Sequence, residues 1–278
     1  MGEGHGMTDV LAVIGVGGMG QSIARRLGSG KTVLLADYNE ETLNSVTSSL
    51  SADGYRVESR HVDVSSAESV CGLAEYAASL GNVAQVAHTA GLSPAQASAD
   101  AILAVDLVGV ALVLQAFGDV VASNGAGVVI ASMAGHMFPP LTAEQTHALA
   151  HNPAGELLDL EFLSPYRAAG PGIAYAIAKQ ANLVRVHAAS AQWGKRGARI
   201  NSISPGIIST PMGQQELNSP VGDGMRAMIA MSATGRIGTP DEIAAAAAFL
   251  LGPEATFITG TDLLVDGGVV AAARAQTR

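Results

Sequence analysis

The fold is decided near the N-terminus, by the segment Val10-Leu11-Ala12-Val13-Ile14-Gly15-Val16-Gly17-Gly18-Met19-Gly20. Its five leading apolar residues predict a buried strand, and a helix is expected from Met19. Gly15, Gly17 and Gly20 satisfy the pattern Gly-x-Gly-x-x-Gly between the two elements. Glycine permits a tight turn and a close backbone approach to a pyrophosphate, which the free amides of a helix N-terminus attract. The segment therefore predicts a dinucleotide-binding turn rather than an ordinary glycine-rich loop.

The same alternation of strand and helix continues along the chain. Helical stretches begin at Met19, Glu40, Ala67, Ala95, Ile173 and Asp241. Strands that alternate with helices indicate an α/β fold, a parallel sheet covered by helices on both faces. Seven strands are expected, which fits a doubly wound sheet of the Rossmann type: residues 10–14, 32–36, 55–62, 83–87, 127–131, 199–203 and 262–265. No linker or internal repeat divides the sequence, so we expect residues 1–278 to form a single domain.

Composition narrows the classes of function. The chain has 278 residues, is 48% hydrophobic and only 14% charged, and can therefore bury a large core. Its net charge of −9 argues against nucleic acid or an anionic membrane as a partner. We find no uncharged apolar run of about 18 residues and no signal-peptide pattern. Cys71 is the single cysteine, so no intrachain disulfide is possible, and a cytoplasmic protein acting on a small molecule is expected.

A tyrosine and a lysine lie four residues apart in Tyr175-Ala176-Ile177-Ala178-Lys179, within an expected helix. They therefore share one helix face. The ammonium is expected to lower the tyrosine pKa from about 10 toward neutrality, where a phenol can exchange protons with a substrate. Taken alone, such a pair is more often a solvated helix face. Its weight comes from Ser132, which ends a buried strand upstream, and from the glycine-rich turn.

Together these features resemble the short-chain dehydrogenase/reductase family over nearly the whole chain. Tyr175 and Lys179 match its YxxxK motif, and Ser132 matches its catalytic serine. Pro205-Gly206-Ile207-Ile208-Ser209-Thr210 matches its nicotinamide-binding loop, and residues 235–243 and 265–268 also follow its pattern. The resemblance implies hydride transfer between a nicotinamide cofactor and an alcohol or ketone, that is, an enzyme acting on CH-OH groups.

The resemblance also implies a role for each catalytic residue. Tyr175 exchanges a proton with the substrate oxygen, and Ser132 hydrogen-bonds and orients that oxygen. Lys179 holds the nicotinamide ribose and depresses the tyrosine pKa. The family's fourth member is an asparagine, and Asp106 stands at the matching position. Asp106 keeps the backbone carbonyl that binds a relay water but loses the amide donor, so it is a candidate relay residue, and a helix residue without a role is nearly as consistent with the sequence.

An acidic residue after the second strand favours NAD over NADP. Asp37 lies 22 residues after Gly15, where a carboxylate accepts hydrogen bonds from both ribose hydroxyls and repels a 2′-phosphate. No arginine follows it closely, and the alternative is a helix cap before Glu40. Asp63 and Val64 resemble the family's adenine-binding pair, although Asp63 could instead cap the next helix. The resemblance assigns the rest of the cofactor to the turn and loops, namely Gly15, Gly17, Gly18, Met19, Gly20, Thr89, Ala90, Gly91, Pro205, Gly206, Ile208 and Thr210, together with Tyr175 and Lys179.

The cofactor turn departs from the family pattern, which is usually Gly-x-x-x-Gly-x-Gly. Matching Gly18-Met19-Gly20 to its end leaves the turn one residue short, and Ile14 stands where the family has a threonine. Thr89 replaces the asparagine of the family's Asn-Ala-Gly. We expect pyrophosphate binding to survive, because backbone amides provide most of it.

A long insertion separates the catalytic serine from the tyrosine. Between Ser132 and Tyr175 lie 42 residues, roughly thirty more than is usual in the family. We expect residues 136–172 to form a helical insertion that serves as a lid or an interface, with helices starting near Thr142 and Asn152. A similar insertion occurs in the bacterial 3α-hydroxysteroid dehydrogenase/carbonyl reductase branch, which residues 173–176 and 193–194 also resemble. Its apolar residues, 136–141 and 162–163, favour a hydrophobic and even steroid-like substrate.

Other interpretations remain open. An enoyl reductase of the same superfamily usually has a longer tyrosine–lysine spacing, and a non-catalytic NAD-binding regulator typically loses one of the two residues. His136, His147 and His151 are close in the sequence, but no cysteine or acidic cluster completes a metal site, so no metal is expected. Ser164 is nearer the usual serine spacing but follows no strand. Because the family's tyrosine-bearing helix commonly pairs between subunits, a homodimer or homotetramer is expected.

Overall fold

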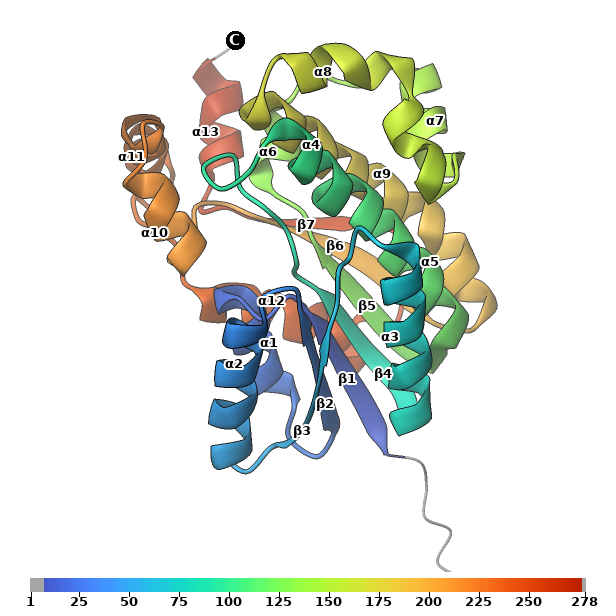
Figure 1. The fold of residues 1–278 in the computed structure, drawn as a ribbon. Helices are drawn as coiled ribbons and strands as arrows, with labels where there is room; N and C mark the ends of the chain where they lie inside the picture. The colour runs from blue at the N-terminus through green and yellow to red at the C-terminus, as the bar shows by residue number, and fades with distance from the viewer. Residues whose placement is uncertain (1–7, 277–278) are drawn as a thin grey trace, which may run out of the picture.

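The computed structural model describes residues 8–276 and contains one seven-stranded, fully parallel sheet (Figure 1). The strand order is β3-β2-β1-β4-β5-β6-β7. The chain runs outward from β1 to β3 and then returns to β4, so the switch in direction lies between β1 and β4. This order confirms the predicted doubly wound Rossmann-type sheet. The strands are β1 (Asp9–Ile14), β2 (Thr32–Asp37), β3 (Arg56–His61), β4 (Asn82–His88), β5 (Val121–Ile130), β6 (Arg199–Pro205) and β7 (Asp262–Val265).

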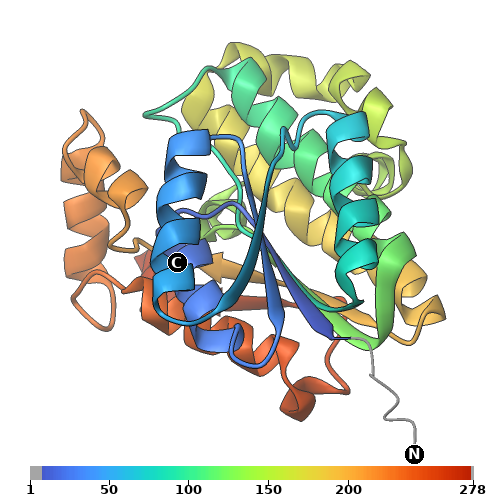
Figure 2. The same cartoon turned by 60° about the horizontal axis from the view of Figure 1, so that its bottom comes forward.

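Helices cover both faces of the sheet, as Figure 2 shows. On one face lie α1 (Gly18–Leu27), α2 (Glu40–Ala52) and α12 (Pro240–Leu251), and on the other lie α3 (Ala67–Leu80), α5 (Val110–Val120) and α9 (Pro171–Lys195). Alternate residues of β1 point to opposite faces, so Leu11 and Val13 pack with the first layer while Ala12 and Ile14 pack with the second. Both faces of β1 are therefore buried, which explains its uninterrupted apolar sequence.

Most expected helix starts are confirmed within two residues. Asn39 caps α2 by accepting a hydrogen bond from the Thr42 amide, and Thr239 forms a capping box with Glu242 at the start of α12. The expected helix from Ala95 instead begins as α4 (Ala99–Ile102), capped by Ser98. β5 begins earlier than expected because Val121 pairs with Val83, and residues 122–125 form a bulge before the pairing resumes.

The central helix contains an irregular turn that the sequence did not predict. Leu103–Gly109 has π-helical hydrogen bonding and joins α4 to α5. The combined helix, Ala99–Val120, is the one helix among residues 8–276 that is long and apolar enough to cross a membrane. Here 67% of its apolar window is buried, and the helix packs against the sheet and against α3 and α9. Its apolar character is therefore that of a core helix.

The insertion folds as short helical pieces over α9. It comprises the end of α6 (Met133–Met137), α7 (Ala143–His151), two 3₁₀ turns (Ala154–Asp159 and Glu161–Leu163) and α8 (Ser164–Ala168). The predicted start of α7 is confirmed by a capping box between Thr142 and Gln145. The second expected helix is only a 3₁₀ turn, which follows Pro153 and has no side-chain cap. Leu149, Leu157 and Leu163 are buried in one apolar cluster with residues of α9 and of the π-helical segment, so the insertion is packed onto the main body of the protein.

The C-terminal part completes the site side of the sheet. After β6, α10 (Pro211–Leu217) and α11 (Gly222–Met231) project beside the carboxyl ends of the strands (Figure 1). A 3₁₀ turn (Pro253–Ala255) precedes β7, and α13 (Val269–Gln276) follows it and contacts α6 and α11.

Candidate functional site

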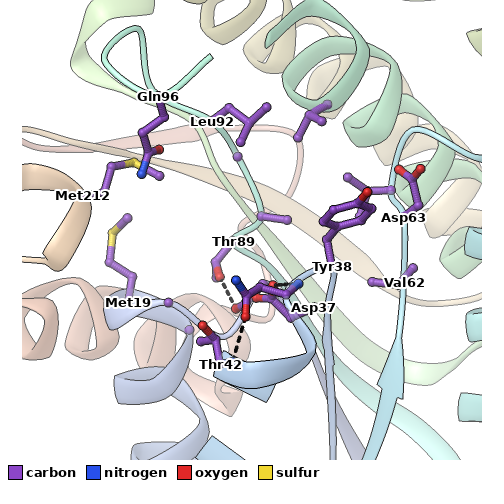
Figure 3. A pocket seen from close by; sticks show the side chains of 18 of the residues that line it. Met19, Asp37, Tyr38, Thr42, Val62, Asp63, Thr89, Leu92, Gln96 and Met212 are labelled. Atoms are coloured by element: carbon purple, nitrogen blue, oxygen red, sulfur yellow. Dashed lines mark hydrogen bonds between the residues drawn. The ribbon is translucent and has the colours of Figure 1, made fainter. Parts of the chain in front are cut away.

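A cavity of about 730 Å³ opens at the carboxyl ends of the strands, next to the switch between β1 and β4 (Figure 3). Tyr38 and Asp63 lie at one end of it, while Gln96 and Met212 lie at the other. Most of the cofactor residues predicted from the sequence line this cavity, namely Gly15, Gly17, Gly18, Met19, Gly20, Asp37, Asp63, Val64, Thr89, Ala90, Gly91 and Thr210. Doubly wound sheets bind ligands at this place.

The glycine turn is held tightly against β4 and left open toward the cavity. Gly15 has φ +92°, and a Cβ there would lie 2.4 Å from the Ala90 amide nitrogen. A Cβ on Gly20 would lie 2.0 Å from the Gly15 carbonyl oxygen. A Cβ on Gly17, by contrast, would meet nothing within 4 Å. Gly17 is the N-cap of α1 and makes no side-chain cap, so the first amides of α1 are available to an anion from the cavity.

Thr89 binds this turn to the end of β4. Its hydroxyl donates to the Gly15 carbonyl oxygen at 2.5 Å. The residue therefore has a structural partner at the position where the family has asparagine, and the same side chain faces the cavity (Figure 3).

Asp37 connects the end of β2 to the glycine turn. Its Oδ2 accepts from the Val16 amide at 2.7 Å, and its Oδ1 accepts from the Asn39 amide at 2.9 Å. Asn39, not Asp37, caps α2, so the alternative of a helix cap is wrong. Carboxylate oxygens accept more than one hydrogen bond, which leaves Asp37 able to accept others at the cavity wall.

Asp63 also lines the cavity and is likewise not a helix cap. Its Oδ1 accepts from both the amide and the hydroxyl of Ser65, and Ser66 caps α3. Val64 is 6% exposed and touches the position of Gly109. Asp37 and Asp63 are the carboxylates that line the cavity.

The nicotinamide-loop residues are divided between two places. Thr210 lines the main cavity and caps α10, accepting from the Gly213 amide at 3.0 Å. Pro205 ends β6, and Ile208 forms a β-bridge with Gly238. Gly206 and Ile208 line a separate cavity of about 80 Å³, and a Cβ on Gly206 would come within 2.7 Å of Asp266.

Tyr175 and Lys179 lie one turn apart on α9, close to Ser132. The Lys179 Nζ is 5.4 Å from the centroid of the Tyr175 ring and donates to the Ile130 carbonyl oxygen at 3.3 Å. Ser132 follows β5 and is the N-cap of α6, where its hydroxyl accepts from the Ala134 amide at 3.1 Å, and it lies close enough to the Tyr175 phenol to lower its pKa. A Cβ on Gly91 would lie 3.3 Å from the Lys179 Nζ, so the catalytic cluster adjoins the main cavity at Gly91.

The expected pKa of Tyr175 is wrong in direction. Burial raises the pKa of the phenol above its usual value of 10, the Asp106 carboxylate raises it further, the nearby Ser132 hydroxyl lowers it, and Glu216 adds a smaller increase. Lys179 is paired with Asp106, its Nζ lying 3.7 Å from Oδ2. The spacing of Tyr175 and Lys179 on one helix predicted that they lie close together. It could not predict the burial of the phenol or the carboxylate of Asp106, which lies on another helix.

Asp106 lies within the π-helical segment and is fully buried. Its Oδ1 accepts from the Leu92 amide at 2.8 Å, and Oδ2 faces Lys179. Burial raises the pKa of this carboxyl, while Lys179 and the Leu92 amide lower it by a smaller amount. The side chain therefore joins the lysine to the loop after β4, and its part in a proton relay stays a prediction.

Two buried polar residues near Lys179 were missed by sequence reasoning. His88, at the end of β4, is 1% exposed, and burial together with Lys179 lowers its pKa to about 3. Asn182 lies one turn after Lys179 on α9 and is fully buried. Among the described residues neither side chain has a hydrogen-bond partner. Their only signal was a polar residue at a position where strand and helix patterns call for an apolar one.

The histidines considered as metal ligands are divided between two separate contacts. His136 Nε2 is 2.8 Å from Asp262 Oδ2 and 3.2 Å from the Ser204 hydroxyl, which joins α6 to β6 and β7. The rings of His147 and His151 contact each other at 4.6 Å on α7. Within residues 8–276 no group of three His, Cys, Asp or Glu side chains is arranged for a metal ion. Ser164 begins α8 in the insertion, and Cys71 is exposed and free.

Comparisons with known proteins cover the whole of this architecture. The family model described as short chain dehydrogenase matches residues 9–144, and the one described as enoyl-(acyl carrier protein) reductase matches residues 140–270. The short-chain dehydrogenase/reductase bsc3 of Alternaria brassicicola is 42% identical, with 94% of this chain and 95% of that protein covered. D-threitol dehydrogenase of Mycolicibacterium smegmatis is 30% identical, with 90% and 88% covered.

Two further matches bear on the branch and on the fold. The 3-alpha-hydroxysteroid dehydrogenase/carbonyl reductase of Comamonas testosteroni is 37% identical, but over only 38% of this chain and 40% of that protein. A solved short-chain dehydrogenase/reductase from Serratia marcescens superposes with a TM-score of 0.74 at 23% identity, covering 95% of this chain and 98% of that one. The structural match supports the fold alone.

Proposed function

The chain belongs to the short-chain dehydrogenase/reductase family, and from this premise we propose that it is an NAD-dependent oxidoreductase that interconverts a secondary alcohol and a ketone. One observation carries the proposal. The cluster of Tyr175, Ser132 and Lys179 adjoins, at Gly91, a cavity built from a glycine turn and two carboxylates. A proton-exchanging phenol is thereby placed next to a site suited to a dinucleotide. The family uses NAD or NADP.

The residues present fit such a cofactor. The open face of Gly17 and the uncapped amides of α1 suit a pyrophosphate, and Asp37 suits a ribose with a free 2′-hydroxyl. Asp63 and Val64 would border the adenine, while Ile208 and Thr210 would hold the carboxamide and Lys179 the second ribose. When bound, the nicotinamide supplies or takes up the hydride. The negative charge of Asp37, with no arginine close behind it, favours NAD.

The protein's own residues control the proton. Tyr175 is protonated at neutral pH because its pKa is raised, and a protonated phenol is the form that donates to the oxygen of a ketone. Ser132 lies near the phenol and would orient the same substrate oxygen. Lys179 and Asp106 form a buried pair behind them that can pass a proton onward. This arrangement favours reduction at neutral pH and oxidation at alkaline pH.

A hydrophobic substrate is supported by the surroundings of Tyr175. Phe138, Leu141, Phe162 and Tyr166 are partly buried in the same apolar cluster as Tyr175, and the rings of Phe138 and Tyr166 meet edge to face at 5.4 Å. We propose that the insertion, residues 136–172, covers the substrate entrance. Burial of a hydrophobic or steroid-like body against it gains about 25 cal/mol per Å². The alternative is that the insertion forms an interface of the expected homodimer or homotetramer.

The remaining assignments are coarser. We propose that the protein is a single domain and that it acts in the cytoplasm on a small molecule, with no nucleic acid or membrane as partner. The net charge of −9 supports this. An enoyl reductase is the second candidate, because the C-terminal half matches a family model of that description. The ordinary spacing of Tyr175 and Lys179 argues against it, and their joint presence argues against a non-catalytic regulator.

The proposal is tested by following NADH absorbance with a panel of ketones and secondary alcohols. We expect at least one ketone to oxidise NADH and the corresponding alcohol to regenerate it. Reduction of an α,β-unsaturated thioester without reduction of any ketone would instead identify an enoyl reductase. Binding of NADH without turnover of any panel member would identify a regulator.

A further inference from the structure

Two segments that are distant in the sequence meet at the end of the cavity opposite Asp63. Gln96, in the loop after β4, donates from Nε2 to the Gln215 Oε1 on α10 at 3.1 Å. Gln96 and Met212 line the cavity at this end (Figure 3). The same loop contacts Asp106, the partner of Lys179, because the Leu92 amide donates to the Asp106 Oδ1. This contact therefore borders the part of the site where a substrate meets Tyr175.

A carboxylic acid is placed within this contact. Glu216 lies four residues after Met212 on α10, so the two side chains share one helix face, and Met212 lines the cavity. Glu216 is partly buried, and its carboxyl lies beside the Ser93 hydroxyl. Ser93 is itself 1% exposed, its amide donates to the Gln96 Oε1 at 3.2 Å, and its hydroxyl has no hydrogen-bond partner among the described residues.

The Glu216 carboxylate is not paired with a cationic side chain among the described residues. Within residues 8–276, none of the ion pairs involves Glu216. Burial raises the pKa of Glu216, and the Ser93 hydroxyl lowers it by a smaller amount. The carboxylate is also close enough to Tyr175 to raise the pKa of the phenol. A partly buried acceptor without a cation is costly unless a ligand donates to it.

We propose that Glu216, with Ser93, binds a second hydroxyl of the substrate, so that the enzyme prefers a hydroxylated ketone or a diol to the same molecule without that group. The inference rests on the proposed function and specifies its substrate class. A neutral hydroxyl suits the site better than an ammonium, because burial of a second charge would add its own desolvation cost. The substrate then combines an apolar body, which faces the insertion, with one polar group, which faces α10.

The test compares cyclohexanone with cyclohexanones that carry a hydroxyl at the 2-, 3- or 4-position, using NADH and the full-length protein. For the wild type we expect kcat/KM to be at least about tenfold higher for one of the hydroxyketones than for cyclohexanone. A hydrogen bond from the added hydroxyl to a charged acceptor is strong enough to give a preference of this size. In Glu216→Leu this ratio should fall to near one. Glu216→Gln keeps an acceptor oxygen and should keep part of the preference, and Glu75→Leu, an exposed change on α3, should keep all of it.

The outcomes separate the two proposals. Turnover of cyclohexanone without any preference for a hydroxyketone, or a ratio unchanged in Glu216→Leu, overturns the role of Glu216 and leaves the proposed function intact. No turnover of any ketone contradicts the proposed function. In that case, titration of the NADH complex by NADH fluorescence still decides the role of Glu216, because tighter binding of a hydroxyketone that is lost in Glu216→Leu supports it and equal binding overturns it.

Discussion

The Lys179 ammonium lies 3.7 Å from the Asp106 carboxylate, and both side chains are buried. The two residues come from different helices, α9 and the π-helical segment before α5. Their pairing places a negative charge next to the Tyr175 phenol, where the family has a neutral asparagine. The lysine charge is thereby compensated, and the phenol keeps its proton to a higher pH.

Asp106→Asn should shift the pH dependence of alcohol oxidation toward lower pH. Oxidation needs the deprotonated phenol, and removing the Asp106 charge lowers the Tyr175 pKa. The variant keeps the size of the side chain and an oxygen for the Leu92 amide. The measurement is kcat/KM for oxidation across a pH series, with NADH binding as the control. A profile that stays in place or moves to higher pH would contradict the electrostatic role of Asp106.

His88 should make the protein less stable at mildly acidic pH. Its pKa is about 3 in the folded protein and about 6.5 in an unfolded chain. Between these values only the unfolded chain binds the proton, so stability falls as the pH is lowered from 6.5 toward 3. At pH 5 the expected loss from His88 alone is about 2 kcal/mol.

Urea unfolding at pH 7 and pH 5 measures this effect, with His88→Leu and His88→Gln compared with the wild type. Both variants should lose less stability on acidification than the wild type does. The comparison between proteins removes the contributions of groups such as Asp106, whose raised pKa acts in the opposite sense. Equal losses in all three proteins would show that His88 does not remain neutral in the fold.

Asp37 should make NAD(H) bind much more tightly than NADP(H). Asp37→Asn removes the charge but retains an oxygen that can accept from the Val16 amide. It should therefore reduce the difference in affinity between NADH and NADPH, mainly by improving NADPH binding. Asp37→Ala also removes that acceptor and should weaken NADH binding as well. Fluorescence titration gives the four affinities. Wild-type protein that binds NADPH as tightly as NADH would refute the assignment.

Replacing residues 139–169 by a short glycine-containing loop should change substrate preference. The number of subunits in the assembly should stay the same. The insertion is held to α9 by Arg185, which donates to the Leu149 and Asn152 carbonyl oxygens. Kinetics with the ketone panel and light scattering provide the two readouts. Phe138→Ala is a milder variant that tests the same surface without removing this contact. Unchanged kinetics with a changed number of subunits would identify the insertion as an interface.

Much of the fold could be predicted because its signals are local. The apolar run of β1, the glycine turn and the capping box at Thr142 are each set by a few consecutive residues, and all are confirmed. The early start of β5 could not be predicted, because it depends on pairing between Val121 and Val83. The 3₁₀ turns after Pro153 likewise depend on packing over α9.

The site was predictable where a motif specified it. Spacing and resemblance predicted that the glycine turn, Asp37 and Asp63 belong to one site, and they line one cavity. They could not show that Lys179 turns toward Asp106, since this contact links two helices through a π-helical turn. The burial of His88 and the proximity of Glu216 to Ser93 are tertiary features of the same kind.

The most direct test of the account is the turnover of Tyr175→Phe on the ketone that the wild type reduces fastest. Phenylalanine keeps the ring that packs in the apolar cluster and removes the hydroxyl that exchanges the proton. NADH binding should remain near the wild-type value, while kcat should fall by about a hundredfold or more, the scale of general acid–base catalysis. A variant that binds NADH normally and retains full turnover would contradict the assignment of Tyr175 as the proton donor.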